Sequence, residues 1–276
     1  MSTRQTISNT DAIARPGDLR ISTMKQLAPD GDWQIALAHD RPSQLFIWTT
    51  QGQAVALVRG EKRGIGTHNA LFVPEGTIFA LTPGRGFSGH AITIPPDLGL
   101  PLPAEPRLMR CRNVSDQAEL GRLIDQMTQE QNTARARYQD AMVAYAQLIA
   151  IWVRRQLASD QGTDPDHGAA RLLMRAFSAE ISLHYRTLDN VAAYARLLDV
   201  SPSHLSRVCS AQTGQTAAQL IAERRLHESR RLLIETNVAL SDIARWLNFS
   251  SPTQFSRFVQ RLSGQTPSAL RRGHRR

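Results

Sequence analysis

The feature that most constrains the fold is an internal repeat in the last third of the chain. The segment AYARLLDVSPSHLSRVCSAQTGQT, which begins at Ala193, aligns with DIARWLNFSSPTQFSRFVQRLSGQT, which begins at Asp242, when one residue is inserted. The matched pairs are Ala195 with Ala244, Leu198 with Leu247, Val200 with Phe249, Leu205 with Phe255, Arg207 with Arg257 and Gly214 with Gly264. Because apolar and capping positions coincide, the repeat indicates two copies of one helical unit.

Each copy predicts a helix, a tight turn and a second helix. The small Ala195 and Ala244 let the second helix approach the first closely. At the turn, Asp199 and Asn248 are residue types that tolerate a left-handed backbone. The pattern is that of two helix-turn-helix units, at about residues 190–213 and 240–263.

The ends of the second helix are marked in both copies. Ser201 predicts an N-cap with Pro202 at the first helical position, and Ser251 with Pro252 repeats the device. Gly214 and Gly264 are the predicted C-caps. Each second helix thus has a predicted first and last residue.

The exposed face of each second helix carries hydroxyl, amide, imidazole and guanidinium groups close to the helix N-terminus. Such groups in that place are typical of a recognition helix that contacts base edges, whereas a plain surface face more often carries Glu and Lys. The candidate DNA-binding residues are Ser203, His204, Ser206, Arg207, Thr253, Gln254, Ser256 and Arg257.

A continuous helical pattern from Ala217 to about Glu235 connects the two units. Such a helix of roughly twenty residues spans about 30 Å, and successive major grooves on one face of DNA lie about 34 Å apart. Both recognition helices could thus lie in adjacent grooves. The helix also carries candidate phosphate contacts, which alternatively only solvate it: Arg224, Arg225, Arg230 and Arg231.

The charge distribution agrees with a polyanionic partner. The chain has a net charge of +9, and from Gln161 onward it holds 16 arginines against 9 acidic residues. Arginine suits phosphates and guanine edges, so double-stranded DNA is the expected partner. A solvated charged face is the alternative explanation of the charge alone.

The N-terminal part predicts a different fold class. Short apolar runs recur about every ten residues from Trp33 to Ile94, with turn signals between them. They predict an antiparallel sandwich or small barrel. The expected strands are WQIALAH, QLFIWTT, AVALVR, ALFV, TIFAL and HAITI.

After a proline-rich bend, helical periodicity from Leu120 to Trp152 predicts an αα-hairpin whose apolar stripe packs on the sheet or on a second copy of the chain. We expect an α+β chain of two domains. The predicted division is a disordered tail at 1–18, a sheet domain with the hairpin at 19–160, a linker at 161–167 and an all-α domain with two helix-turn-helix units joined by a long helix at 168–276.

From about Leu172 to Arg272 the sequence resembles the AraC/XylS family of bacterial transcription regulators. The resemblance rests on SPSHLSR, FSSPTQFSR, the arginine-rich connecting helix and the closing GQTPSALRR. It implies a seven-helix DNA-binding domain and base contacts by Ser203, Ser206, Arg207, Thr253, Gln254 and Arg257. In this family the N-terminal domain is often a cupin-like β-barrel that binds an effector or mediates dimerisation, and the segment from His68 to Leu81 resembles the strand-turn-strand of such a barrel.

The resemblance implies a sequence-specific transcription regulator and no enzyme. RNA polymerase, a small-molecule effector and a homodimer partner are further expectations. One alternative is a cupin-type metal-dependent enzyme fused to a DNA-binding module, but the paired histidines of such sites are missing, since His39, His68 and His90 are single and separated. We expect no cofactor and no metal.

The other alternative is a non-specific architectural DNA binder, which would bind all sequences about equally.

Only two cysteines are present, and no apolar run is long enough to span a bilayer. A cytoplasmic protein with no membrane contact is therefore expected.

Overall fold

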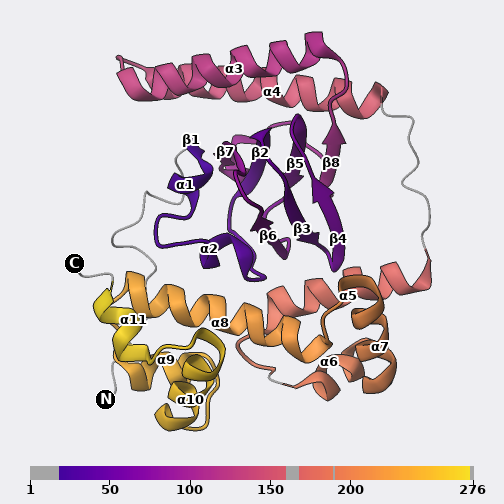
Figure 1. The fold of residues 1–276 in the computed structure, drawn as a ribbon, viewed down its shortest axis with the longest axis vertical. Coiled ribbons are helices and arrows are strands. Elements are labelled where there is room, and N and C mark those ends of the chain that lie inside the picture. Colours follow the sequence, from indigo (N-terminus) through magenta and orange to yellow (C-terminus); the bar gives the residue numbers. More distant parts are fainter. Residues whose placement is uncertain (1–18, 160–167, 189, 274–276) are drawn as a thin grey trace.

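The computed structural model describes residues 19–159, 168–188 and 190–273 (Figure 1). The predicted tail at 1–18 and the predicted linker at 161–167 lie outside the described residues. The N-terminal part holds eight strands and three short helices among the described residues. These are β1 (Arg20–Thr23), α1 (Met24–Leu27), α2 (Trp33–Ala36), β2 (Gln44–Gln51), β3 (Ala54–Val58), β4 (Glu61–Ile65), β5 (Asn69–Val73), β6 (Phe79–Pro83), β7 (Ser88–Ile94), the 3-10 helix η1 (Pro96–Leu98) and β8 (Arg107–Arg110).

The strands form two antiparallel sheets. One has five strands in the order β1-β7-β2-β5-β8, and the other has three in the order β4-β3-β6. Side chains of Leu45 and Ile47 from the larger sheet share a buried core with Ala56 and Leu81 from the smaller one. The antiparallel, sheet-rich fold is as predicted, but these two sheets do not join into one closed hydrogen-bonded barrel.

The helical hairpin is confirmed and covers the second face of the larger sheet. It consists of α3 (Val114–Thr133) and α4 (Tyr138–Ser159). The Trp152 ring lies edge-on to Phe46 and Trp48, with centroids 6.3 and 6.1 Å apart. The hairpin's buried residues Ile124, Met127 and Trp152 belong to the same core as those of the sheet. Of the two predicted partners for this stripe, the structure therefore has the sheet (Figure 1).

The strand predicted at WQIALAH is wrong, because residues 33–36 form the helix α2. This segment turns toward the C-terminal helices, where the Gln34 carbonyl accepts a hydrogen bond from His227 Nε2 at 3.1 Å. The strands that sequence patterns missed are β1, β4 and β8. All three lie at sheet edges, where one side of the strand has no hydrogen-bonded neighbour.

Between Gly168 and Gly273 the described residues form seven helices, as the family resemblance implies. They are α5 (Ala169–His184), α6 (Val191–Leu197), α7 (Pro202–Thr213), α8 (Ala217–Glu235), α9 (Leu240–Trp246), α10 (Pro252–Ser263) and α11 (Pro267–Gly273). The two-part α+β architecture is thus as predicted. No helix among the described residues is long and apolar enough to cross a membrane.

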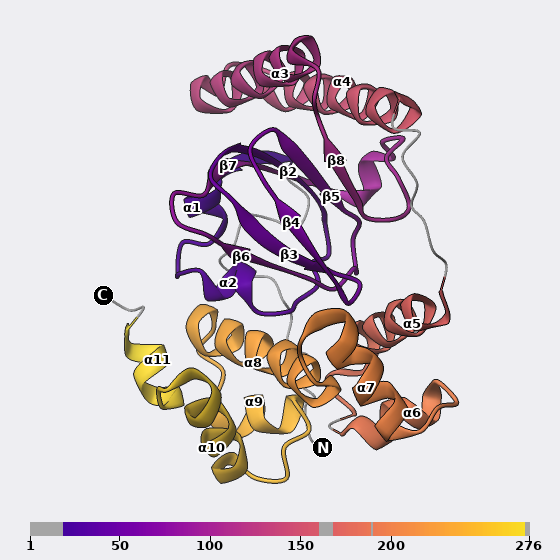
Figure 2. The ribbon, with the colours of Figure 1, turned by 45° about the vertical axis from the view of Figure 1, so that its right-hand side comes forward.

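The long helix α8 lies between the sheet region and the helices α9 and α10, and it also contacts α6 and α7 (Figures 1 and 2). Its central segment, residues 224–229, is buried all round. Toward the sheet region, Arg224 Nε donates to Asp40 Oδ1 at 2.6 Å, and the His227 ring stacks on His39 with centroids 4.3 Å apart. The Trp33 ring lies 4.4 Å from the Arg230 guanidinium. The sheet region and α8 are therefore joined by buried polar contacts.

Candidate nucleic-acid interface

The first helix-turn-helix unit consists of α6, a tight turn and α7. Asp199 at the turn has φ 53°, the left-handed conformation that the sequence predicts. The chain reverses there because Asp199 N donates to Arg196 O at 3.3 Å and Val200 N donates to Ala195 O at 3.0 Å. Ala195 is fully buried, so the absence of a larger side chain lets α7 pack closely on α6.

The second unit repeats this geometry in α9 and α10. Asn248 has φ 57°, its N donates to Arg245 O at 3.1 Å, and Phe249 N donates to Ala244 O at 2.9 Å. The Asn248 side chain also donates to Thr187 O at 3.0 Å, a contact to the segment that precedes the first unit. The sequence repeat is therefore a structural repeat.

Both second helices begin and end where the sequence predicts. The Ser201 hydroxyl accepts from His204 N, and the Ser251 hydroxyl accepts from Gln254 N, each at 3.1 Å. A proline follows each serine at the first helical position. Gly214 at φ 70° and Gly264 at φ 73° end the two helices in the left-handed conformation.

The predicted base-contacting residues lie on the outer faces of α7 and α10. Leu205 and Phe255 are fully buried and fix the inward faces. Figures 1 and 2 show α10 on the side of α8 that faces away from the sheets, whereas α7 lies next to α5 and one part of it contacts β4. Exposed residues are Ser203, Arg207, Thr253, Gln254 and Arg257, and half-buried ones are His204, Ser206 and Ser256.

Contacts within this surface already orient several of its side chains. Arg207 Nη2 lies 3.0 Å from His204 Nδ1. In the second unit, Gln254 Oε1 accepts from both the N and the Oγ of Ser250 at 2.9 Å. A base contact through Gln254 Oε1 would exchange these two hydrogen bonds for new ones.

Two of the four arginines predicted to contact phosphates are buried, so that prediction is wrong for this conformation. Arg224 is 4% exposed and pairs with Asp40, and Arg225 is 6% exposed. Arg225 Nη2 donates to Leu247 O at 2.7 Å, and its guanidinium lies 4.2 Å from the centre of the Phe249 ring. Neither cation can reach DNA without leaving these partners.

The other two arginines of α8 are also engaged. Arg231 bonds to Glu228 at 2.8 Å and to Glu235 at 3.3 Å, which offsets its charge. Arg230 stacks on the Trp33 ring. Burial would raise the pKa of the Glu228 carboxyl, but the hydrogen bond and charge of Arg231 outweigh it and lower that pKa to about 2. Glu228 therefore stays ionised beside Arg231.

Sequence reasoning missed Arg196 and Arg245, which occupy equivalent positions in the repeat, directly after Ala195 and Ala244. Both are exposed and lie in the last turn of the first helix of their unit. Arg245 Nη1 lies 3.1 Å from the exposed carboxylate of Asp242. The repeat alignment was the signal that could have identified this pair.

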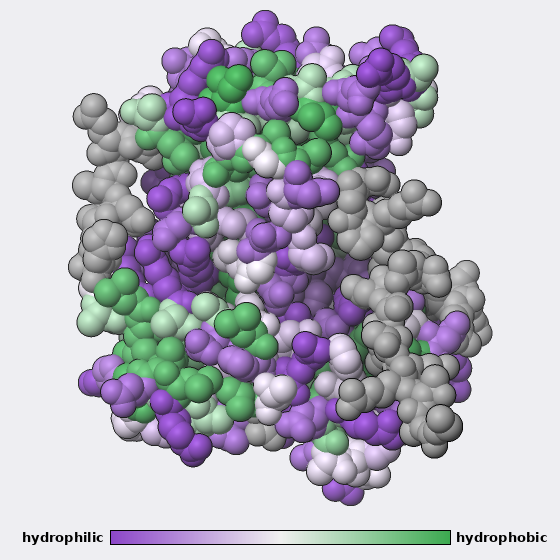
Figure 3. All heavy atoms as spheres, turned by 180° about the vertical axis from the view of Figure 1, so that it is seen from behind, coloured by the Kyte–Doolittle hydropathy of each residue, from purple (hydrophilic) through white to green (hydrophobic). Residues whose placement is uncertain are grey.

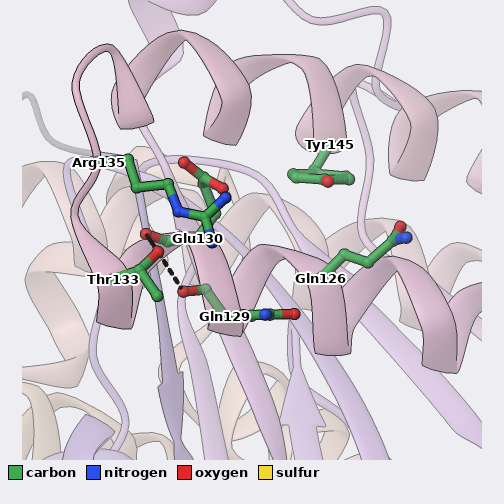
Figure 4. Close-up of a pocket in the computed structure, with 6 residues that line it drawn as sticks. All are labelled: Gln126, Gln129, Glu130, Thr133, Arg135 and Tyr145. Atoms are coloured by element: carbon green, nitrogen blue, oxygen red, sulfur yellow. Dashed lines mark hydrogen bonds between the residues drawn. The ribbon is translucent and has the colours of Figure 1, made fainter.

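A small polar cavity of about 190 Å³ lies on the helical hairpin (Figure 4). It is below the volume of about 300–1,000 Å³ that sites for small molecules usually have. Its lining comes from α3, α4 and the loop between them. The residues are Gln126, Gln129, Glu130, Thr133, Arg135 and Tyr145.

The three histidines considered as metal ligands lie in separate places. His39 is buried against His227, and His68 stacks on Trp48 with centroids 5.9 Å apart. His90 is on β7. Within the part of the chain that the structure describes, no group of three or more His, Cys, Asp or Glu side chains is placed to hold a metal ion.

Comparison with known proteins gives a family match for the C-terminal part. Residues 194–273 match a family model described as a helix-turn-helix domain. The chain is 42% identical over 87 residues to the HTH-type transcriptional regulator GlxA of Rhizobium meliloti (strain 1021), which covers 32% of this chain and 26% of GlxA. It is 27% identical over 133 residues to the arabinose operon regulatory protein of Escherichia coli (strain K12), covering 47% and 46% of the two chains.

The chain therefore spans about a quarter of GlxA and less than half of the arabinose operon regulatory protein. Among solved structures, ToxT from Vibrio cholerae O395 is 16% identical, with a TM-score of 0.42 over 91% of this chain and 95% of that one.

Proposed function

Because residues 194–273 match a helix-turn-helix domain, in a segment whose sequence resembles the AraC/XylS family, we propose that the chain is a sequence-specific DNA-binding transcription regulator. The observation that carries the proposal is the repeated geometry of α7 and α10, two capped helices with outward polar faces at the two ends of one helix. Its partner is double-stranded DNA, and its place of action is the cytoplasm. RNA polymerase is the second partner that we propose.

The spacing supports simultaneous binding in two grooves. α8 has 19 residues, and at about 1.5 Å per residue it spans about 28 Å. Successive major grooves on one face of DNA lie about 34 Å apart. In this proposal Ser203, Ser206 and Arg207 contact bases in one groove, and Thr253, Gln254 and Arg257 contact bases in the next, while His204 and Ser256 support them.

Phosphate contacts are assigned to Arg196 and Arg245 in place of Arg224 and Arg225. Each follows the buried alanine of its unit and lies beside the turn that leads into a recognition helix. In helix-turn-helix proteins the first helix crosses the DNA backbone. Two equivalent cations at equivalent places would position both units in the same way.

The experiment is a selection of bound duplexes from a random pool, followed by competition against random duplex. A regulator enriches a motif with two parts about one helical turn apart and prefers it by at least about 10³-fold. Arg196→Ala and Arg245→Ala should weaken binding about equally on all sequences and lower the salt dependence. A non-specific architectural protein would give no motif.

The roles of the two recognition helices are separable. Arg257→Ala should cost about 1–3 kcal/mol of binding free energy on the selected site and relax specificity at one base pair. Arg207→Ala should do so at a different base pair, and by no more than Arg257→Ala, because Arg207 stands among serines with shorter reach. An equal loss on every sequence would refute the base-contact assignment of either arginine.

For the N-terminal part we propose a cupin-like sensor or dimerisation domain at 19–160, joined through 161–167 to the DNA-binding domain at 168–276. The two facing antiparallel sheets support this division. We also propose that this N-terminal domain binds a small-molecule effector. The relatives named above are transcriptional regulators, which favours this function over a metal-dependent enzyme.

A further inference from the structure

The helix α5 has two apolar faces that lie opposite each other. One face holds Met174, Phe177 and Ile181, which are at most 1% exposed and belong to the core shared with α7 and the sheet region. The other points to solvent. A surface helix of a globular protein normally has a single apolar face, and the opposite side is polar. The outward face of α5 therefore needs an explanation.

The outward face is a continuous apolar stripe. Leu172 is 51% exposed and Leu183 is 68% exposed, although both are large apolar residues. Figure 3 shows an apolar patch at the lower left, where α5 lies in that view. The exposed members of the stripe are Ala169, Leu172, Ala176, Ala179 and Leu183.

The spacing of these five residues alternates between three and four along the chain. This is the spacing of the a and d positions of a coiled-coil heptad, which places apolar residues along a seam between two helices. The alanines at the centre let two helix backbones come close, and the leucines lie toward the ends. The stripe therefore fits a partner helix better than it fits solvent.

The charged residues beside the stripe indicate which helix that is. Arg175 lies on one flank at a g position, and Glu180 lies on the other flank at an e position. In a parallel pair of helices, each g residue faces the e residue five positions later on the partner. Two parallel copies of α5 would bring Arg175 of each copy to Glu180 of the other, which gives two symmetric ion pairs.

An antiparallel pair would instead bring the Arg175 flanks of both copies together. Both side chains are accessible for the parallel arrangement, since they are 24% and 28% exposed. Arg175 Nη1 now lies 3.7 Å from Glu105, and Glu180 lies 3.3 Å from His184. Glu105 and His184 lie on the same chain as these two residues, and each is half exposed or nearly so.

We propose that a second copy of this chain binds the stripe, with the two α5 helices parallel about a two-fold axis. The hairpin α3–α4 is the other surface considered for dimerisation, but most of its apolar residues are buried on the sheet, while Leu148 and Ile151 of α4 are exposed. At 16 residues α5 is short, so the association is weak in dilute solution and is strengthened where one DNA molecule holds two copies. The interface does not depend on DNA binding and stands if the proposed function fails.

The first test is sedimentation equilibrium of the full chain from about 1 to 100 μM, with circular dichroism to confirm folding. The wild type should approach twice the monomer mass at the upper end. The double variant Leu172→Glu with Leu183→Glu should stay monomeric and folded. The matched control, Leu148→Glu with Ile151→Glu on α4, changes two other exposed apolar residues and should dimerise as the wild type does. A monomeric wild type, or a monomeric control with a dimeric stripe variant, would overturn the proposal.

The second test is charge reversal, which also examines orientation. Arg175→Glu and Glu180→Arg should each weaken dimerisation about tenfold, since each places like charges across the axis. The double variant should recover the wild-type constant, because the two pairs re-form with opposite sense. Glu105→Ala, which removes one intrachain partner of Arg175, should have no such effect. Dimerisation that the double variant does not recover would exclude the parallel arrangement.

The third test uses Ala179→Cys, a d position that meets its own copy across the axis of a parallel pair. Mild oxidation should yield a disulfide-linked dimer, whereas Ala176→Cys mixed with Ala179→Cys would be needed in the antiparallel case. The native Cys111 and Cys209 are buried, so they should contribute little background. DNA binding is measured separately on each variant, so that loss of dimerisation and loss of the proposed function can be distinguished.

Discussion

The two helix-turn-helix units have the same local construction but different support. Their turns differ by only a few degrees in φ at Asp199 and Asn248, and their caps use the same residues. Both units pack against α8, and the first unit packs in addition against α5 and, through α7, against β4 of the sheet region. The second unit packs in addition against α11, away from the sheets (Figure 2).

The support of the second unit comes from arginines. Arg225 bonds to Leu247 O, and Arg271 donates to Leu233 O and Val238 O at 3.3 and 2.6 Å. Buried residues of both units belong to one core with Met174, Ala38 and Leu57, and the first unit in addition contacts β4 through α7. Residues within each unit therefore determine its backbone geometry, while the adjacent helices and strands determine which contacts stabilise its position. Changes in the sheet region should therefore reach the first unit more directly than the second.

The largest effect should come from removing the arginine under the second unit. Arg225→Ala loses a charged hydrogen bond and the contact with the Phe249 ring, so the free energy of unfolding should fall by about 3 kcal/mol. Urea unfolding measures this. Arg245→Ala removes an exposed arginine of the same unit and should change stability by less than about 0.5 kcal/mol. Equal losses would show that the second unit does not depend on the buried cation.

The matching change for the first unit is Gly60→Ala, in the turn between β3 and β4. Gly60 has φ 75°, and a Cβ there would clash with Cε of Met174 and lie 3.1 Å from its Cβ. Backbone strain and overpacking together should cost about 2–3 kcal/mol. Gly76→Ala has a similar φ of 65° but open space around it, so it should cost only about 1 kcal/mol. If both variants melt at the same temperature, the contact between Gly60 and α5 contributes nothing.

The joint between α8 and the sheet region should be sensitive to acid. Burial, with the Arg224 charge, lowers the pKa of His227 to about 3, and burial with the His227 charge lowers the pKa of His39. The two histidines therefore bind protons more readily when the protein is unfolded, or when α8 has separated from the sheet region, than in the native structure. Stability should be fully present above about pH 6.5 and should fall by about 2 kcal/mol at pH 5 through His227, with His39 acting in the same direction.

Thermal unfolding from pH 7.5 to 5 measures this effect. His227→Gln, which cannot be protonated, should flatten the dependence, whereas His184→Gln on the exposed surface of α5 should leave it unchanged. The carboxyl of Glu228 does not interfere, because its lowered pKa places its loss below about pH 4.5. A profile that His227→Gln does not alter would mean that the histidine pair separates without consequence.

The smallest effect concerns the two turns. Asp199→Ala places alanine at positive φ and should cost about 1 kcal/mol. Asn248→Ala should cost about 1.5 kcal/mol, because it also removes the hydrogen bond to Thr187 O. Glycine at either position should remove the part of the cost that comes from backbone strain, but it should not recover the hydrogen bond of Asn248. Calorimetry can resolve these differences, and a larger cost at Asp199 would reverse the expected order.

Several features followed from sequence because they depend on a few neighbouring residues. The serine caps, the prolines after them, the left-handed Asp199 and Asn248 and the terminal glycines are each fixed within one turn of chain. Central strands such as β2 were also predictable, since burial on both faces makes them apolar. The edge strand β4, EKRGI, was not, because its exposed charged residues carry no strand signal.

Tertiary structure decided the rest. The five residues at Trp33–Leu37 alternate between apolar and polar as a strand does, but five residues are too few to distinguish the period of a strand from that of a helix. Contact with α8 selects the helix. The repeat by itself determined two helix-turn-helix units and the residues that face outward from them. Whether an arginine of α8 faces DNA or a buried carboxylate was decided by the sheet region, because the position of Asp40 beside Arg224 depends on how residues 184 positions apart pack together.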